Sequence, residues 1–307
     1  MSSINTNIAA MTALQALNKT NADVLNTQNR ISTGLRVASA SDNAAYWSIA
    51  TTMRSDRESI STVSDALGLG AATVDIASKA LETSVDVASQ IKSKLLAARS
   101  PGVDRGKIQA EIEQLQSSLQ DTVNGATFSG QNWLAVDSTG TTSRTLVSSF
   151  SRDAAGDISI GTISVDVGAT GSMMIDTSGG GAGVLDSDRT VTSGGTYTIL
   201  TLDISTLTDD TADLADLEDY IAGVDDAISS ITGAATDLGA VKTRINLQKD
   251  FADSLMDAID TGIGTLVDAD MNEESTRLQA LQVRQQLGVQ ALSLANQSAQ
   301  SILSLFR

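Results

Sequence analysis

The side chains that most often carry out chemistry in proteins are absent from this sequence or poorly spaced for the task. There is no Cys and no His, which excludes disulfides, thiolate nucleophiles, Ser-His-Asp triads and metal sites built from these ligands. The acidic pairs Asp186/Asp188 and Asp209/Asp210 offer oxygen ligands for Ca²⁺, but neither has the spacing or the closing Glu of an EF-hand loop. Glycines 179–181 lack the Lys-Ser/Thr that follows a phosphate-binding loop. We therefore predict no enzyme, no cofactor and no metal, with the acidic clusters as solvated surface.

The composition favours long helices packed on one another. Hydrophobic residues make up 41% of the chain and aromatic residues only 3%, so the core must consist mainly of Ala, Leu, Ile and Val. Pro101 is the single proline, which leaves long helices almost uninterrupted. At 307 residues, the chain can bury a substantial core in one large domain or in two to three ordinary ones.

Charge is distributed unevenly along the chain. The net charge of −17 argues against nucleic acid and anionic membranes as partners. Residues 137–226 carry 16 acidic and 3 basic side chains, whereas the last 33 residues contain three Arg and no acid. We expect the middle to face water and the ends to face protein. No membrane span or Sec-type signal peptide is visible at the start, so the sequence suits a cytosolic protein or one exported by another route.

The N-terminal 36 residues show a heptad-like stripe that predicts a packed helix. Asn21 and Gln28 lie within this stripe, where polar residues either specify register or are simply exposed. Gly34 weakens the helix, and Asp42 is the candidate N-cap of the next one. The stripe consists of Ala10, Leu14, Leu17, Asn21, Val24, Gln28, Ile31 and Leu35.

Further helices are predicted on both sides of the middle. Apolar spacing predicts one over 44–99, ended by Ser-Pro-Gly at 100–102, and another over about 104–123. Helical spacing returns near 213 and continues to 259. The last helix, from about 272, has two apolar stripes and so requires more than one packing partner. One stripe contains Leu281, Leu292, Ala295, Ala299, Ile302 and Phe306; the other contains Ala280, Val283, Leu287 and Leu294.

The middle of the chain has a different character. Residues 137–208 hold 11 of the 24 Gly, and short alternating runs at 157–160, 162–167 and 196–200 indicate strands. Residues 153–157 resemble a hairpin turn. We therefore predict a mainly α fold, with long coiled-coil-like helices from both termini and a small, acidic, exposed β-rich insert in the middle.

Several motifs at both ends resemble bacterial flagellin, the subunit of the flagellar filament. Their order along the chain makes the resemblance specific. The sequence of residues 45–50 is similar to that of the alphaproteobacterial, rhizobium-type branch. The motifs are Ile4-Asn5-Thr6-Asn7, Asn29-Arg30-Ile31-Ser32-Thr33-Gly34-Leu35-Arg36, Ser41-Asp42-Asn43-Ala44-Ala45, Ile108-Gln109-Ala110-Glu111-Ile112, Thr127-Phe128-Ser129-Gly130, Gln290-Ala291-Leu292, Ala295-Asn296-Gln297 and Ile302-Leu303-Ser304-Leu305-Phe306-Arg307.

The resemblance implies an architecture and a set of partners. It implies an inner coiled-coil domain from 1–42 and 267–307, a helical domain with a β-hairpin region from 43–167 and 206–266, and a variable outer insert from 168–205. It implies unfolded export by the flagellar type III apparatus with an export chaperone, folding beneath a filament cap, and an extracellular helical polymer of this chain, alone or with other flagellins. The implied subunit-interface residues are Ile4, Ile8, Leu14, Leu17, Val24, Ile31, Leu35, Leu281, Leu287, Leu292, Ala295, Ile302, Leu305 and Phe306.

The resemblance also places two segments that host immune receptors recognise in related proteins. The plant-sensed stretch corresponds to 29–50, where Asn43, Tyr46 and Trp47 depart from the usual pattern. The mammalian receptor segment corresponds to Gln90, Ile91, Lys94 and Leu95 together with Glu111, with Ile91 in place of a key Arg. Weak recognition is therefore expected. A flagellar hook-filament junction protein or another secreted coiled-coil protein remains the alternative, although the final Leu-Ser-Leu-Phe-Arg favours flagellin.

Overall fold

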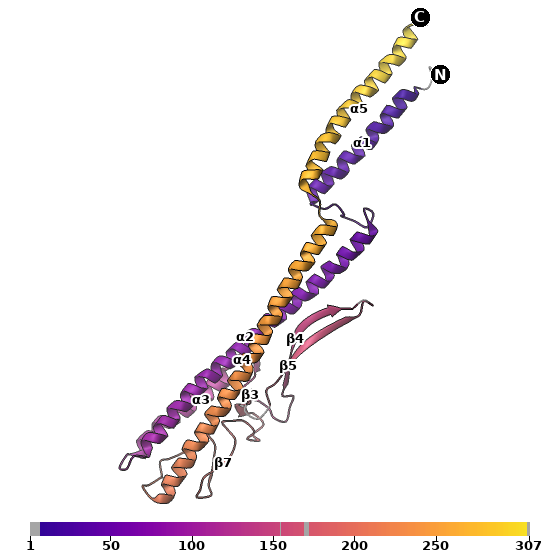
Figure 1. The fold of residues 1–307 in the computed structure, drawn as a ribbon. Coiled ribbons are helices and arrows are strands. Elements are labelled where there is room, and N and C mark those ends of the chain that lie inside the picture. Colours follow the sequence, from indigo (N-terminus) through magenta and orange to yellow (C-terminus); the bar gives the residue numbers. More distant parts are fainter. Residues whose placement is uncertain (1–6, 154, 169–171, 306–307) are drawn as a thin grey trace. The chain divides into compact units, whose positions relative to one another are not determined.

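The computed structural model describes residues 7–153, 155–168 and 172–305, with side chains described as far as 297. Five helices account for most of the described chain, and short strands occupy the middle (Figure 1). The predicted fold class is therefore confirmed. The elements in order are α1 (Ile8–Thr33), α2 (Ala44–Ala98), α3 (Arg105–Gly125), β1 (Thr127–Phe128), β2 (Gln131–Asn132), β3 (Ala135–Val136), β4 (Ser143–Arg152), β5 (Ile158–Asp166), β6 (Ile175–Asp176), β7 (Arg189–Thr190), β8 (Thr196–Tyr197), α4 (Thr211–Val267) and α5 (Met271–Leu305).

The chain divides into two compact units. The first, which we call unit 1, comprises Met1–Glu58 and Met256–Arg307, and so contains α1, α5 and the adjoining ends of α2 and α4. The second, unit 2, is Ser59–Leu255, with α3, all the strands and the larger parts of α2 and α4.

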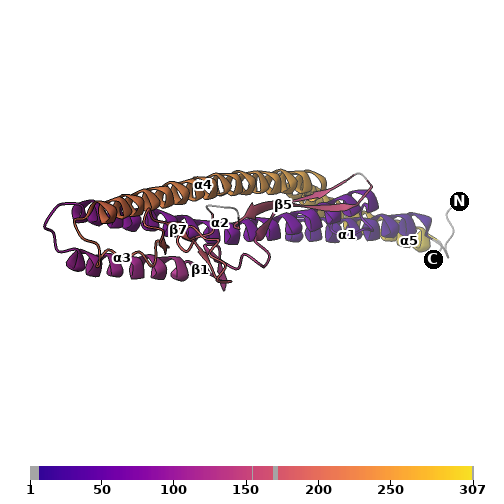
Figure 2. The ribbon, with the colours of Figure 1, turned by 90° about the horizontal axis from the view of Figure 1, so that it is seen from below.

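In unit 2, α2 lies between α3 and α4 (Figure 2). Ion pairs connect α2 to both neighbours, with Lys94 reaching Glu111 of α3 and Lys92 reaching Asp225 of α4. The regularly spaced positions that predict the second helix are buried throughout, because α2 has a packed partner along that face. These positions form a stripe that consists of Ile60, Val63, Leu67, Gly70, Val74, Ala77, Leu81, Ser84, Ala88, Ile91 and Leu95.

The helix ends follow local sequence signals, with one correction. Gly34 caps α1 in the left-handed conformation, with φ of 73°. Asp42 is not the N-cap of α2, because the side chain of Asn43 accepts hydrogen bonds from the amides of Ala45 and Tyr46. Asp42 instead accepts hydrogen bonds from the amides of Ser39 and Ala38 and from the Ser39 hydroxyl. These hydrogen bonds lower the pKa of the Asp42 carboxyl. Asp42 thus closes the loop that precedes the helix.

Strand pairing in unit 2 is mostly short. The exception is the antiparallel hairpin of β4 and β5, whose register shifts between Val147 and Ser149. Its turn is the predicted one, since the Asp153 carboxylate accepts from the amides of Ala155 and Asp157. The other strands form two-residue pairs: β1 with β2, β7 with β8, and β3 parallel to β6.

The middle segment is less exposed than the sequence predicts. Met174, Leu185 and Ile199 are completely buried and belong to the same hydrophobic cluster as the helices of unit 2. Gln109 and Gln116 of α3 bind the backbone of residues 199–204. Hydrophobic periodicity does not predict the burial of these apolar residues, because they lie in irregular backbone that follows neither a helical nor a strand repeat. The segment is therefore part of the core of unit 2.

Candidate functional site

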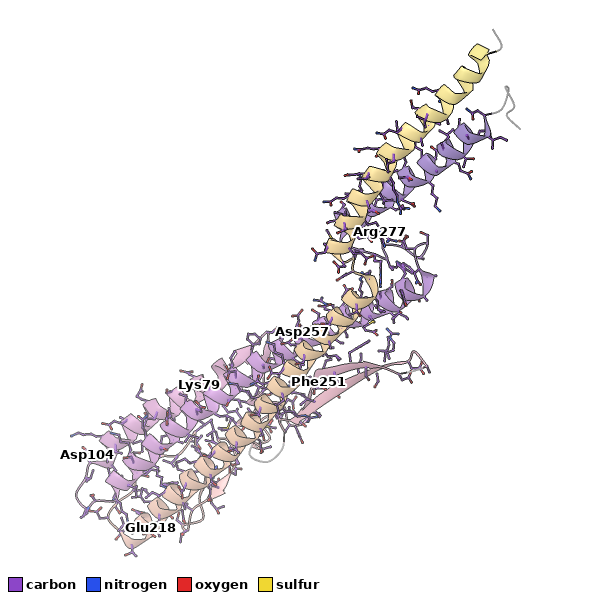
Figure 3. All side chains as sticks on the ribbon, turned by 45° about the horizontal axis from the view of Figure 1, so that its top comes forward. Lys79, Asp104, Glu218, Phe251, Asp257 and Arg277 are labelled. Carbon is purple, nitrogen blue, oxygen red and sulfur yellow. The ribbon has the colours of Figure 1, made fainter. Side chains whose placement is uncertain are left out.

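In unit 1, α1 and α5 lie side by side with the N- and C-terminal ends of the described chain at the same end (Figures 1 and 3). The less exposed positions of each helix recur every three or four residues, as in a coiled coil. We call these two rows the seam. On α1 they are Ala10, Ala13, Leu17, Thr20, Val24, Thr27 and Ile31; on α5 they are Glu274, Leu278, Leu281, Gln285, Gly288, Leu292 and Ala295.

The seam buries little apolar surface. Among the described residues of α1 and α5, the buried ones are Val24, Thr27, Glu274 and Leu281, and two of these four are polar. Small residues elsewhere let the backbones approach, since a Cβ added at Gly288 would lie 3.2 Å from the side chain of Leu17. A pair packed this closely on small and polar residues gains little from the hydrophobic effect.

Polar contacts fix the register of the pair at three levels. The amide of Asn7 donates to the carbonyl of Ala295 at 2.9 Å, and the amide of Gln285 donates to the Asn21 side chain at 2.8 Å. At the far end, Arg30 donates to Glu274 at 3.2 Å. A shift of one helix along the other would break all three bonds. Of the two interpretations left open for Asn21, the register role is therefore the one the contact supports.

The predicted stripe of α1 differs from the seam by one residue at three positions, where Ala13, Thr20 and Thr27 take the places of Leu14, Asn21 and Gln28. Leu14 and Gln28 are exposed, whereas their neighbours Ala13 and Thr27 face α5. A pattern search favours the larger Leu14, but the close approach of the helices selects the smaller residue. Gln28 therefore has no place in the seam.

Large apolar side chains remain exposed on the outer faces of both helices. On α5, Val283, Leu287 and Leu294 follow the second stripe predicted from the sequence. The analogous residues of α1 surround a shallow depression that includes Ile8, Met11 and Leu14. The exposed fractions are 66% for Ile8, 63% for Met11, 48% for Leu14, 60% for Leu25, 55% for Val283, 57% for Leu287, 54% for Val289 and 72% for Leu294.

The predicted subunit-interface residues fall into groups. Six lie in the seam: Leu17, Val24, Ile31, Leu281, Leu292 and Ala295. Three are exposed: Ile8, Leu14 and Leu287. The side chains of Ile302 and Leu305, and the residues Ile4 and Phe306, lie outside the described part. The prediction omitted the exposed residues Leu25 of α1 and Val289 of α5. Neither residue belongs to an apolar stripe that the sequence shows for its helix.

Leu35, the remaining predicted residue, lies in a joint between the linker after α1 and the linker after α4. Leu35 forms a β-bridge with Asp268, and the carbonyl of Val267 accepts hydrogen bonds from the amides of Arg36 and Val37 at 2.7 and 3.2 Å. Leu35 packs on the small cluster of Val37, Ala50 and Val267. The joint ties the two ends of the chain together inside unit 1.

The segment that resembles an immune-receptor site is only partly accessible. Ile91 and Leu95 have no exposed surface, because both point into the core of unit 2. Gln90 is exposed, and Lys94 forms an ion pair with Glu111 beside a shallow groove between α2 and α3. An Arg in place of Ile91 would therefore be buried in this fold.

The acidic residues singled out in the sequence are used in local hydrogen bonding. Asp186 accepts from the amide of Asp176 at 2.8 Å, and Asp209 accepts from the buried Arg105 at 2.7 Å. Hydroxyls of Ser178 and Ser138 hold the pKa of Asp176 far below its usual value. Within the described residues, no group of three or more acidic side chains is placed to hold a metal ion, and no helix is long and apolar enough to cross a membrane.

The comparisons with known proteins agree with this architecture. Models for the bacterial flagellin N-terminal and C-terminal helical regions match residues 4–139 and 221–306. Flagellin C and Flagellin A of Rhizobium meliloti (strain 1021) are 47% and 40% identical to this chain, and the flagellin of Brucella melitensis biotype 1 is 43% identical, in each case over the full length of both chains. The resemblance to the rhizobium-type branch is confirmed. The chain belongs to the bacterial flagellin family, and it is a structural subunit of the extracellular flagellar filament.

Proposed function

We propose that the outer faces of α1 and α5 form the principal contact between subunits, so that each helix pair is covered by the pairs of neighbouring copies. The observation that carries this proposal is the row of exposed apolar side chains on both helices, from Ile8 to Leu25 and from Val283 to Leu294. Contiguous exposed apolar surface of this kind marks a protein interaction site. Polymerisation with itself and with other flagellins is established for the family; the role of these faces is our assignment.

We assign each of the three parts predicted from the sequence to one layer of the filament. Residues 1–42 and 267–307 form the inner contact layer, 43–167 and 206–266 form the surrounding helical layer, and 168–205 lie outermost. The exposed apolar rows of α1 and α5 support an inner place for the terminal segments, because such surface is better covered by neighbouring subunits than by water.

We further propose that the terminal helices complete their folding during assembly. The seam supports this, because among the described residues its buried apolar side chains are only Val24 and Leu281, which is too little apolar surface to hold two long helices on their own. A chain whose ends are unpaired before assembly also suits unfolded export by the flagellar type III apparatus, with an export chaperone before export and a filament cap after it. Amide exchange tests the proposal: residues 7–36 and 275–305 exchange rapidly in the monomer and are protected in the filament. Slow exchange in the monomer would contradict it.

Seeded polymerisation tests the role of the apolar faces. Leu287→Asp places a charge in the exposed row of α5, and we expect elongation from wild-type seeds to slow by about tenfold or more, since burying an unpaired charge costs more than about 1.4 kcal/mol. Ser293→Asp is the matched control, because Ser293 is an exposed residue on a different face of α5. Equal elongation rates for the two variants would remove the outer face of α5 from the interface.

The receptor segment leads to a second, smaller proposal. Gln90, Lys94 and Glu111 are the accessible members, and the ion pair with Lys94 engages the one acidic side chain among them. We propose weak activation of the mammalian flagellin receptor, measured with monomer in a reporter assay against a strongly activating flagellin. A response of equal strength would contradict the proposal.

A further inference from the structure

A cavity of about 220 Å³ lies in unit 2 between β5, α4 and the segment that links β2 to β3. We call it the β5 cavity. An engineered cavity of about 150 Å³ in another protein accepts benzene, so the β5 cavity has room for one large apolar side chain. The buried residues that line it are Trp133, Leu134, Val165, Val167, Ala234 and Leu238.

The outer edge of β5 carries backbone groups that no strand uses. The amide of Val167 donates to the carbonyl of Thr142 at 3.0 Å, in continuation of the β4–β5 register. Residue pairs of an antiparallel ladder alternate between those that exchange hydrogen bonds and those that do not, so the N–H and C=O groups of Ser164 and Asp166 point away from β4. Among the described strands, β5 pairs with β4 alone. This edge can therefore accept a further strand.

The same two residues, Ser164 and Asp166, line the β5 cavity. Their side chains lie on the exposed face of the strand, opposite the buried Val165 and Val167. The hydroxyl of Ser164 is hydrogen-bonded to that of Ser143 at 2.8 Å, and the carboxylate of Asp166 accepts from the amide of Gly168 at 3.0 Å. We infer that these two residues border the cavity through their outward backbone groups.

Trp133 adds a buried donor to the cavity wall. Its side chain lines the cavity and the residue is only 2% exposed, yet its Nε1–H has no acceptor among the described residues. The indole N–H can only donate, and buried polar groups are normally paired. An occupant that brings a carbonyl oxygen would satisfy it, and a peptide backbone carries one at every residue.

The charge at the rim favours a basic occupant. Asp237 of α4 lines the cavity, is exposed and forms no ion pair with the described residues. No Lys or Arg is among the described residues that line the cavity. Opposite charges select a partner and speed its approach, so Lys or Arg beside the apolar side chain of an occupant suits this rim.

We propose that the β5 cavity binds an extended peptide segment of a partner protein, which adds to the β4–β5 hairpin as a third, antiparallel strand. One large apolar side chain of the segment fills the cavity, a backbone carbonyl accepts from Trp133, and a neighbouring basic side chain lies near Asp237. In strand addition, main-chain hydrogen bonds give affinity and a pocket selects the side chain. The proposal concerns unit 2 and goes beyond the contacts between subunits.

A synthetic peptide tests the proposal on the full-length monomer. The probe is acetyl-Lys-Thr-Leu-Thr-Lys-amide, in which Leu and both Lys share one face of a strand. The chain contains two Trp, so Trp47→Phe leaves Trp133 as the only indole, whose fluorescence should change saturably with the probe. A probe with Ser in place of Leu should bind about tenfold more weakly or worse. No saturable binding by fluorescence and calorimetry, or equal binding of both probes, would overturn the proposal.

Backbone methylation of the probe separates strand addition from simple apolar binding. With Leu opposite Val165, the Leu N–H points away from β5, whereas both Thr N–H groups point toward it. N-methylation of one Thr should therefore weaken binding about tenfold, and N-methylation of Leu by about threefold at most. An equal loss for the two methylated probes, or a larger loss for methylated Leu, would reject the antiparallel strand.

Protein variants locate the site, and seeded elongation identifies the source of its occupant. Asp237→Lys should weaken binding of the probe by about threefold or more at low salt. Asp226→Lys is the matched control, because Asp226 is exposed on the same helix but does not line the cavity. Equal affinities for these variants would overturn the site. A saturating probe should leave elongation from wild-type seeds unchanged, whereas inhibition would assign the cavity to a neighbouring copy and overturn the partner protein.

Discussion

The guanidinium of Arg30 on α1 donates a hydrogen bond of 3.2 Å to the carboxylate of Glu274 on α5, whose side chain is only 5% exposed. Arg277, which Figure 3 labels on α5, donates a second bond to the same oxygen at 3.0 Å. The other oxygen, Oε2, has no hydrogen-bond partner among the described residues. A buried carboxylate held by two Arg thus marks the end of the seam nearest the joint.

Loss of Arg30 should weaken the helix pair. Arg30→Ala leaves the buried charge of Glu274 with one cation, and we expect the filament to lose about 1–3 kcal/mol of stability per subunit, the usual cost of a missing bond to a charged group. The loss appears as a lower depolymerisation temperature. Arg284→Ala is the control, because Arg284 is exposed on α5 and forms no ion pair with the described residues. Unchanged filament stability in Arg30→Ala would show that Arg277 alone is sufficient.

The close approach at Gly288 makes a second prediction. A side chain there meets Leu17, so Gly288→Leu should force α1 and α5 apart at a cost of about 1–3 kcal/mol. The critical concentration for polymerisation should rise by about five- to a hundredfold. Gly239→Leu in α4 is the matched control, since nothing lies within 4 Å of its added Cβ and it should stabilise its helix. A normal critical concentration for Gly288→Leu would show that the seam can widen freely.

Gln116 makes a third prediction, about the middle segment. Its side-chain amide donates to the carbonyls of Ile199 and Leu202, both at 3.0 Å. Gln116→Ala leaves the buried Ile199 carbonyl without this donor, while the Leu202 carbonyl keeps only its bond from Gln109. The free energy of unfolding of unit 2 should fall by about 1–3 kcal/mol, measured by urea denaturation of the monomer. Gln120→Ala, an exposed change on the same helix, should have an effect within about 0.5 kcal/mol. Equal stability of the two variants would show that the segment is not held by α3.

Tyr197 makes a fourth prediction, about alkaline stability. Burial raises the pKa of its hydroxyl from 10.0 to about 12, so the folded chain holds this proton more tightly than the unfolded chain. The resulting stability is fully present below pH 10 and is lost as the pH rises from 10 through 12. Its full size is about 2–3 kcal/mol.

The variant Tyr197→Phe separates the two roles of the hydroxyl. At pH 8 it should lose about 1 kcal/mol, because the hydrogen bond to the Asp219 carbonyl, 2.8 Å long, is gone. Between pH 10 and 12 its urea midpoint should fall less than that of the wild type. Tyr46→Phe, at an exposed tyrosine, is the control. Parallel pH profiles for wild type and Tyr197→Phe would contradict the assignment.

Ile91 makes the fifth prediction. Ile91→Arg would place an unpaired charge in the core of unit 2, and we expect a loss of about 4 kcal/mol or more. Gln90→Arg, on the adjacent exposed residue, should fold normally. Circular dichroism during urea denaturation compares them. Equal stability would mean that the helix can rotate residue 91 to the surface.

The sequence by itself determined the elements that repeat regularly. The stripe from Ile60 to Leu95 predicts α2 and its buried face, because one heptad-like pattern with a packed partner leaves a single consistent orientation. The end motifs likewise identify the family. The second apolar stripe of α5 indicates a partner for its outer face, since a contiguous row of exposed Val and Leu side chains marks an interaction site.

Only the tertiary structure decided which of two adjacent residues faces a partner. Ala13 and Thr27, rather than Leu14 and Gln28, face α5, because a close helix approach rewards small side chains that a hydrophobicity pattern ranks low. The same holds for the middle segment, where Met174, Leu185 and Ile199 enter the core from irregular backbone. Their burial depends on long-range packing and on bonds from Gln109 and Gln116, and a local pattern contains neither.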